Sequence, residues 1–214
     1  NKDLEKDTVG PKIKLDIFDD FEKVSKAAWQ SADGIITYRG SKKIMQSINI
    51  INNTKIIVRG GVGFDGLNLK ELGEKGIAVC TVPDYGTTEV ADHAIALMLM
   101  MRRGLDQYDY IMRKSADKNW KYLLSPCIDR IRGKNFGVIG LGRIGNAAAR
   151  RAKSFDMTIY FYDPYLPDGS ELSVGYKRLY SLEELFKTCD TISIHCPLNK
   201  ETNCIIDKKL LKLS

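Results

Sequence analysis

The stretch Phe-Gly-Val-Ile-Gly-Leu-Gly-Arg-Ile-Gly, residues 136–145, decides the fold of this 214-residue chain. Its first four residues are mostly apolar and predict a short strand that is buried on both faces. Three glycines follow in G-x-G-x-x-G spacing, and the alanine-rich segment 143–155 predicts a helix. A second strand is predicted at 158–162. Strand, glycines, helix and strand in this order are the context that the motif requires in a Rossmann βαβ unit.

Each part of this unit has a mechanical role in binding a dinucleotide. Gly140 allows a tight turn, Gly142 lets the backbone approach a pyrophosphate, and Gly145 lets the helix pack closely on the strand. The free N–H groups at the start of the helix then face the phosphates. Asp163 ends the second strand, 163 − 145 = 18 residues after the last glycine. Its carboxylate suits the adenosine ribose and would repel a 2′-phosphate, so the unit predicts NAD rather than NADP as cofactor.

Composition narrows the class of protein. Hydrophobic residues make up 43% and charged residues 28%, as in soluble globular proteins. The longest apolar run, 94–101, is too short to cross a bilayer. The net charge of +6 is scattered among acidic residues, which favours a solvated surface over a nucleic-acid site. Five cysteines without a C-x-x-C pair favour free thiols in a reducing cytoplasm and predict no metal site.

The first half of the chain predicts a small α/β domain of its own. Strands that alternate with helices predict a parallel sheet covered on both faces. The expected strands are 12–17, 34–38, 55–58 and 77–80, and the expected helices are 21–30, 41–51 and 67–75.

A second glycine-rich turn, Arg-Gly-Gly-Val-Gly at 59–63, follows the predicted strand 55–58. Ligands of open α/β sheets bind outside the carboxyl ends of strands. The glycines leave backbone N–H groups unshielded, as in a nest for a small carboxylate, and Arg59 can add a bidentate contact. An ordinary turn with a solvated Arg59 explains the same residues equally well.

A long helix is expected after the loop 84–88, with Thr87 or Thr88 as its cap. Its middle, 94–101, is apolar on every side, which predicts burial on all faces and a homodimer contact. His93 is interpreted as a structural group. Residues 104–133 predict a further helix and an irregular arm.

The last third of the chain predicts an unfinished Rossmann sheet. Ser181 and Glu184 form a capping box for a helix at 181–188, and a strand is expected at 190–196. Residues 203–213 predict a strand edge or a helix. With about three strands of a sheet that normally has two halves, we expect a truncated chain.

Six ordered motifs resemble the D-isomer-specific 2-hydroxyacid dehydrogenase family, and among its branches they are most similar to that of the C-terminal binding proteins and their bacterial dehydrogenase relatives. These motifs are residues 56–65, 76–86, 89–94, 137–145, 161–169 and 194–202. The resemblance implies two Rossmann-like domains, a substrate domain at 1–89 and an NAD-binding domain at 90–214, with the chain clipped at both ends. It implies that Arg59 and the backbone of Gly61, Val62 and Gly63 hold the substrate carboxylate.

The resemblance also implies a set of residues around NAD. Arg143 and Ile144 would lie on the pyrophosphate and Val90 near the nicotinamide. The whole set is Val90, Gly140, Leu141, Gly142, Arg143, Ile144, Gly145, Tyr162, Asp163, Pro164, His195, Cys196, Pro197 and Thr202. The family's catalytic Arg, Glu and His have no counterpart in this chain, so no catalytic residue is predicted here.

Two functions remain open at this point. The first is a cytoplasmic, NAD-dependent dehydrogenase that interconverts a small 2-keto acid and a D-2-hydroxy acid. The alternative is an NAD(H)-sensing corepressor of the same branch, located in the nucleus. The bacterial character of residues 83–93 favours the enzyme.

Overall fold

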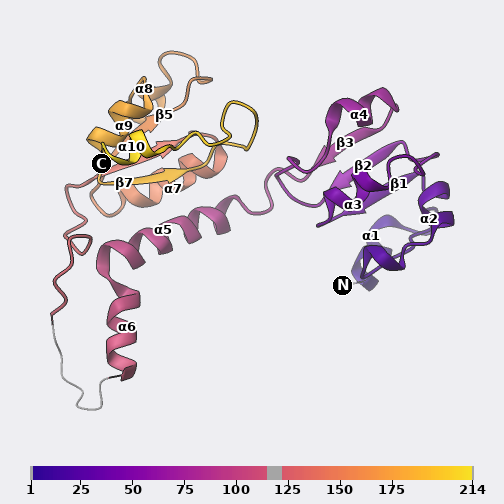
Figure 1. The fold of residues 1–214 in the computed structure, drawn as a ribbon, viewed down its shortest axis with the longest axis horizontal. Helices are drawn as coiled ribbons and strands as arrows, with labels where there is room; N and C mark the ends of the chain where they lie inside the picture. The colour runs from indigo at the N-terminus through magenta and orange to yellow at the C-terminus, as the bar shows by residue number, and fades with distance from the viewer. Residues whose placement is uncertain (1, 115–121, 214) are drawn as a thin grey trace. The chain divides into compact units, whose positions relative to one another are not determined.

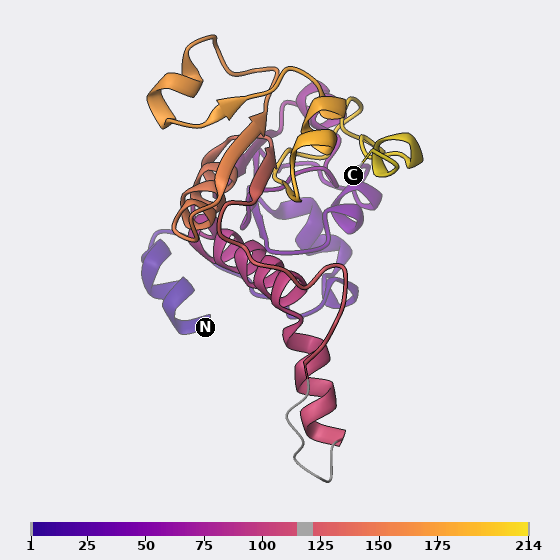
Figure 2. The same cartoon turned by 90° about the vertical axis from the view of Figure 1, so that its left-hand side faces the viewer.

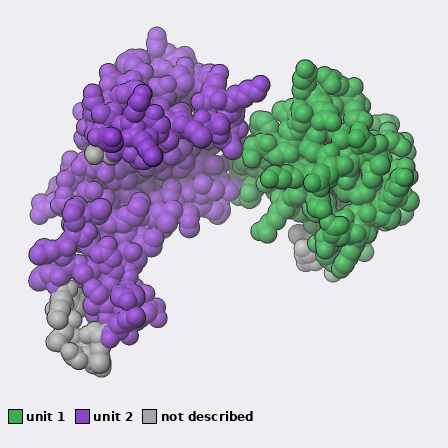
Figure 3. All heavy atoms as spheres, viewed as in Figure 1, with its two compact units in different colours: residues 1–85 green, residues 86–214 purple. Residues whose placement is uncertain are grey.

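The computed structural model describes residues 2–114 and 122–213, which fall into two compact units. Unit 1 comprises residues 1–85 and unit 2 residues 86–214 (Figure 3). Among the described residues, none of the helices is both long enough and apolar enough to cross a membrane.

Unit 1 is built on a three-stranded parallel sheet in the order β1-β2-β3 (Figure 1). The strands are β1, Gly34–Thr37; β2, Ile56–Arg59; and β3, Ala78–Thr81. The helices are α1, Lys2–Val9; the 3-10 helix η1, Phe21–Lys23; α2, Lys26–Ser31; α3, Ser41–Gln46; and α4, Leu69–Glu74. Because β2 is the central strand, the turn that follows Arg59 lies at the middle of the carboxyl end of the sheet.

The core of unit 1 lies on one face of this sheet. Ile57 of β2 packs with Ile44 of α3 and Leu72 of α4, and all three are fully buried. On the opposite face Ile36 is 56% exposed and Ile56 is also exposed. The expectation of a sheet covered on both faces is therefore wrong for the described part of unit 1, because α2, α3 and α4 all contribute to the same core.

Two local predictions in unit 1 are also wrong. Residues 12–17 alternate in polarity but form no strand, because they join neither edge of the described sheet. The expected helix 21–30 is broken into η1 and α2, because Ser25 adopts an extended conformation and caps α2. Its Oγ accepts a hydrogen bond from the Ala28 N–H at 3.1 Å.

Unit 2 contains a four-stranded parallel sheet in the order β6-β5-β4-β7. The strands are β4, Asn135–Ile139; β5, Thr158–Tyr162; β6, Lys177–Arg178; and β7, Thr191–Ile194. The helices are α5, Thr87–Arg103; α6, Leu105–Lys114; α7, Arg143–Lys153; α8, Ser170–Val174; α9, Leu182–Thr188; and α10, Lys208–Leu211. With β4 followed outward by β5 and β6 on one side and by β7 on the other, the four strands have the order 3-2-1-4 of a Rossmann fold. The predicted α/β fold is confirmed.

Helices cover both faces of the unit 2 sheet. On one face Phe161 of β5 packs with Ala149 of α7 and Met98 of α5. The helices α5 and α7 lie side by side in both ribbon views (Figures 1 and 2). On the other face Ile139 of β4 packs with Leu185 of α9 and Leu210 of α10. The glycine turn after β4 is therefore anchored on both sides of the sheet.

The long helix α5 differs from its prediction in two respects. It begins at Thr87 after Gly86, and neither threonine caps it. Its apolar middle is buried on one side, at Ile95 and Met98, whereas Leu97 is 41% and Met101 is 56% exposed. Burial on all faces is thus wrong for the described chain. Of the predicted arm at 104–133, residues 115–121 lie outside the described residues.

The caps of the later helices follow the sequence more closely. Ser181 caps α9 by accepting a hydrogen bond from the Glu184 N–H at 3.2 Å. The Glu184 carboxylate accepts from the N–H of Tyr180, one residue before the expected position. Residues 203–213, whose type the sequence left open, contain the short helix α10, capped by Asp207.

Asp156 connects α7 to β5 in a left-handed conformation, with φ at 58°. A β-carbon is strained in this region, and glycine relieves the strain. Asp156→Gly is expected to be at least as stable as the parent, and Asp156→Ala less stable than Asp156→Gly by about 1 kcal/mol. Urea unfolding measures the order. Asp156→Asn is the control for the exposed ion pair with Arg132 at 3.3 Å. Equal stability of the glycine and alanine variants would contradict this account.

Candidate functional site

The turn from β4 into α7 is shaped by two glycines that admit no side chain. Gly140 has φ at +85°, and its N–H donates to the carbonyl of Tyr162 at 2.9 Å. A Cβ at Gly140 would lie 2.8 Å from the Cys196 nitrogen. A Cβ at Gly145 would lie 2.1 Å from the Gly140 oxygen. The loop after β7 and the start of α7 can therefore both approach the turn closely.

Gly142 is different from its two neighbours in the motif. It precedes the first residue of α7, and a Cβ built on it would meet no atom of the described residues within 4 Å. Space is thus left open where the N-terminus of α7 directs its N–H groups. This arrangement suits an anionic ligand that lies against the backbone.

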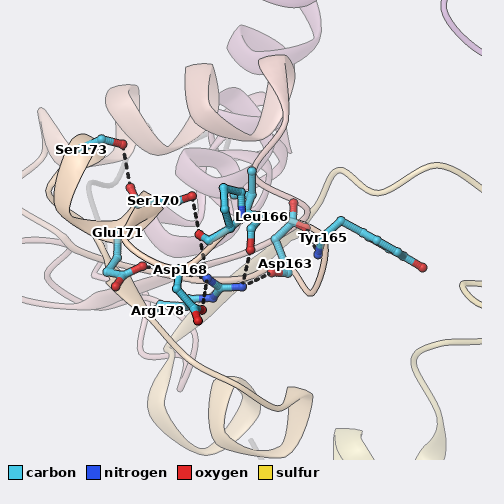
Figure 4. Close-up of polar contacts among 9 residues, drawn as sticks. Asp163, Tyr165, Leu166, Asp168, Ser170, Glu171, Ser173 and Arg178 are labelled. Atoms are coloured by element: carbon cyan, nitrogen blue, oxygen red, sulfur yellow. Dashed lines mark hydrogen bonds and ion pairs between the residues drawn. The ribbon is translucent and has the colours of Figure 1, made fainter.

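Asp163 is fixed beside the turn by two backbone donors. Its Oδ2 accepts from the Leu141 N–H at 2.9 Å. Its Oδ1 accepts from the Tyr165 N–H at 3.0 Å (Figure 4). A carboxylate offers about four lone-pair sites, so both oxygens keep acceptor capacity. The structure brings together the carboxylate and the glycine turn that the sequence placed in one site.

The end of β7 reaches the same turn. The His195 N–H donates to the Ile139 carbonyl at 2.8 Å, and the His195 Nε2 lies 2.8 Å from the Ser193 hydroxyl. Burial lowers the pKa of His195, which favours a neutral imidazole near pH 7. Burial raises the pKa of Cys196, and the nearby charge of Asp163 adds to the effect. The residues that follow β5 and β7 therefore both contact the glycine turn at the carboxyl end of the sheet.

A tight loop follows β7. The Thr202 hydroxyl donates to the Pro197 carbonyl at 2.5 Å, and the Asn199 N–H donates to the Thr202 Oγ1 at 2.9 Å. The Glu201 carboxylate accepts a hydrogen bond from the Tyr165 hydroxyl. This contact joins the loop after β7 to the loop that bears Asp163.

The other predicted residues of unit 2 lie at the same end of the sheet or along α5. Leu141 is buried in the core, Arg143 and Ile144 form the first turn of α7, and Pro164 directly follows Asp163. Val90 is exposed in the first turns of α5, next to Ala91, which packs on α7. Tyr162 contacts the turn through its carbonyl, while its side chain packs towards α9.

The sequence analysis missed one residue of this region, Arg178 on β6. Its guanidinium donates to the carbonyl of Asp163 at 3.0 Å and is drawn among its partners in Figure 4. A two-residue strand is too short for hydrophobic periodicity to reveal. The available signal was an arginine placed just before the capping box of α9.

In unit 1 the second glycine turn has a compact geometry. The Gly61 N–H donates to the Arg59 carbonyl at 2.8 Å, and the Gly60 N–H donates to the Thr37 carbonyl at 2.7 Å. The Arg59 guanidinium lies over Gly61, where a Cβ would be 1.6 Å from its nitrogen. Arg59 is therefore held against the turn, with Val62 and Gly63 following it.

The fold and the glycine turn of unit 2 define a nucleotide-binding Rossmann unit. Residues 95–214 match the NAD binding domain of the D-isomer specific 2-hydroxyacid dehydrogenases. The chain belongs to this family, and the predicted resemblance is confirmed at that level.

Named relatives agree with this assignment. A D-3-phosphoglycerate dehydrogenase of Methanocaldococcus jannaschii is 35% identical over 184 residues, covering 86% of this chain and 34% of its own length. Another, of Bacillus subtilis, is 28% identical over 214 residues, covering 97% and 39%. The chain thus spans between a third and two fifths of these relatives.

Solved structures give the same result. D-lactate dehydrogenase of Aquifex aeolicus, complexed with NAD and lactic acid, has a TM-score of 0.78 at 28% identity, over 90% of this chain and 56% of that one. An NADPH-dependent glyoxylate/hydroxypyruvate reductase of Sinorhizobium meliloti, complexed with NADP and malonate, has a TM-score of 0.77 at 28% identity, over 91% and 58%.

Alanine substitutions at Gly145 and Gly142 are expected to distinguish a glycine that is needed for packing from one that borders open space for a ligand. In Gly145→Ala the added methyl group overlaps the Gly140 carbonyl. The free energy of unfolding should therefore decrease by an amount near the upper end of the roughly 1–3 kcal/mol that overpacking costs. Gly142→Ala places its methyl in open space and should cost at most about 1 kcal/mol, the scale of an N-cap change. Urea unfolding measures both stability losses. Equal losses in the two variants would contradict the different roles given to Gly142 and Gly145.

Proposed function

We propose that the protein acts as an NAD-dependent D-2-hydroxyacid dehydrogenase, which transfers a hydride between NAD(H) and a small 2-keto or 2-hydroxy acid. The observation that carries the proposal is the Asp163 carboxylate, held by the Leu141 N–H beside the glycine turn. Because the named relatives are dehydrogenases and reductases, the enzyme is favoured over the corepressor.

The Asp163 carboxylate also supports NAD as the preferred cofactor. The relatives complexed with dinucleotides include one with NAD and one with NADP, so the family fold accommodates both. A carboxylate can accept hydrogen bonds from both ribose hydroxyls and repels a phosphate at the 2′ position. We therefore assign the choice of NAD to Asp163.

The remaining cofactor contacts are proposed from the family resemblance, and the geometry of unit 2 supports them. NAD supplies or accepts the hydride. The pyrophosphate is assigned to the open space at Gly142 and to the N–H groups of Arg143 and Ile144. His195, Cys196, Pro197 and Thr202 are assigned to the adenine and nicotinamide-ribose side, and Val90 to the nicotinamide.

The substrate carboxylate is assigned to the turn after β2. Since the Gly61 N–H is used by the Arg59 carbonyl, the donors proposed for the nest are the N–H groups of Val62 and Gly63. The Arg59 guanidinium, lying against Gly61, adds a positive charge. No acid–base residue is assigned, because His195 is bonded to Ser193 among the cofactor contacts and His93 lies exposed on α5.

NADH titration by protein fluorescence tests the cofactor assignment. Asp163→Ala is expected to weaken NADH binding roughly 10- to 100-fold, the scale of charge-assisted hydrogen bonds, and to reduce the discrimination against NADPH. Asp109→Ala, which removes an exposed carboxylate of α6, is the control and should bind NADH as the parent does. Unchanged NADH affinity in Asp163→Ala would contradict the assignment.

Turnover of the intact protein tests the reaction itself, since no acid–base residue is assigned among residues 1–214. NADH oxidation is followed with glyoxylate, hydroxypyruvate and other small 2-keto acids. The proposed enzyme consumes NADH with at least one of them and produces the D-isomer wherever the product is chiral. If the intact protein binds NADH but turns over no member of the panel, the dehydrogenase function is refuted and only NADH binding remains.

We also propose a homodimer through the exposed apolar side of α5. Leu97, Met100 and Met101 are all exposed on this helix, which is unusual for side chains of their size at neighbouring positions. Met101→Glu places a charge in that contact and is expected to give monomers. Sedimentation of parent and variant at micromolar concentration decides, with Met112→Glu on α6 as the comparison. A monomeric parent would refute the dimer.

A further inference from the structure

The short strand β6 carries an arginine that is unusually enclosed. The Arg178 side chain is only 8% exposed, although it carries a positively charged guanidinium group. A buried charge is tolerated when hydrogen bonds and opposite charges surround it. The position of β6 is fixed by parallel pairing with β5, in which Arg178 lies opposite Phe161.

The hydrogen-bond and ion-pair partners of Arg178 among the described residues lie in the segment 163–171, and its guanidinium also lies 5.4 Å from the ring centre of Tyr180. One guanidinium nitrogen donates to the carbonyls of Asp163 at 3.0 Å and Leu166 at 2.8 Å (Figure 4). The other donates to the Pro167 carbonyl at 3.1 Å. The carboxylates of Asp168, at 3.4 Å, and Glu171, at 3.9 Å, balance its charge. One side chain thus binds three main-chain carbonyls of the loop that connects β5 to α8.

This loop begins at the residue assigned to the adenosine ribose. Arg178 holds the main-chain carbonyl of Asp163, while Leu141 and Tyr165 hold its carboxylate through their N–H groups. Both ends of Asp163 are therefore fixed, one by the glycine turn and one by β6. A carboxylate fixed in advance accepts ribose hydrogen bonds without the entropy cost of ordering the loop.

We propose that Arg178 is a positioning residue that sets the Asp163 carboxylate for the adenosine ribose, and that it thereby sustains the preference for NAD over NADP. The inference rests on the proposed NAD-binding function. Arg178 acts through Asp163, since its guanidinium is directed at main-chain carbonyls inside the loop (Figure 4). Enclosed in this way, it is turned away from the role of an arginine that accommodates a 2′-phosphate.

The planar fork of arginine is what the three carbonyls require. Lysine keeps the charge and its attraction to Asp168 and Glu171, but it lacks the rigid fork that reaches several carbonyls at once. Arg178→Lys therefore distinguishes the effect of the positive charge from that of the guanidinium hydrogen bonds. Arg178→Gln retains a donor without the charge. Arg132→Lys is the matched control, because Arg132 is an exposed arginine of the same unit with a simple ion pair to Asp156.

The experiment measures the dissociation constants of NADH and NADPH for each variant, with circular dichroism confirming a folded state. Arg178→Lys is expected to weaken NADH roughly tenfold, the factor that about one net hydrogen bond represents, while NADPH affinity changes less. The ratio of the NADPH dissociation constant to the NADH dissociation constant therefore falls. Arg178→Gln should show the same fall, and Arg132→Lys should leave the ratio unchanged.

A double-mutant cycle with Asp163→Ala separates positioning from general loop support. If Arg178 acts through Asp163, adding Arg178→Lys to Asp163→Ala causes no further loss of NADH affinity. A folded Arg178→Lys protein with an unchanged ratio of constants, or additive losses in the cycle, overturns the inference. Failure of the parent protein to bind NADH at all refutes the proposed function instead.

Discussion

The close approach of α7 to β4 is the constraint on which the rest of unit 2 depends. Gly145 lies so near the Gly140 carbonyl that no β-carbon fits between them. This contact lets the buried alanines of α7, such as Ala148 and Ala152, reach the sheet. It also fixes the direction in which the first N–H groups of α7 point. Packing and anion binding therefore share one geometric origin.

The sequence was most informative where chemistry and spacing agree. The glycine motif, the predicted strands on either side of α7 and the terminal Asp163 were all predictable, because each residue type has a narrow conformational reason to be there. The capping box of α9 was predictable for the same reason. The segment 12–17 shows the opposite case, since its alternation of polarity describes a strand but cannot supply a pairing partner.

Two features depended on tertiary context that the sequence does not display. The apolar middle of α5 is compatible with burial on any side, and in the described chain the core takes up Ile95 and Met98 but leaves Leu97 and Met101 exposed. β6 is defined by its neighbour β5 rather than by its own two residues. Motifs consequently did not reveal Arg178, because its shortest hydrogen bonds go to main-chain carbonyls, which carry no residue signature.

The three glycines of the motif are under different kinds of constraint. Gly140 and Gly145 are required by backbone conformation and by contact, whereas among the described residues no atom lies within 4 Å of a β-carbon built at Gly142. In descendants that abandon the dinucleotide but keep the fold, the first and third glycines should persist while the middle one drifts. The middle position of the motif therefore offers a molecular record of whether a lineage still uses its cofactor.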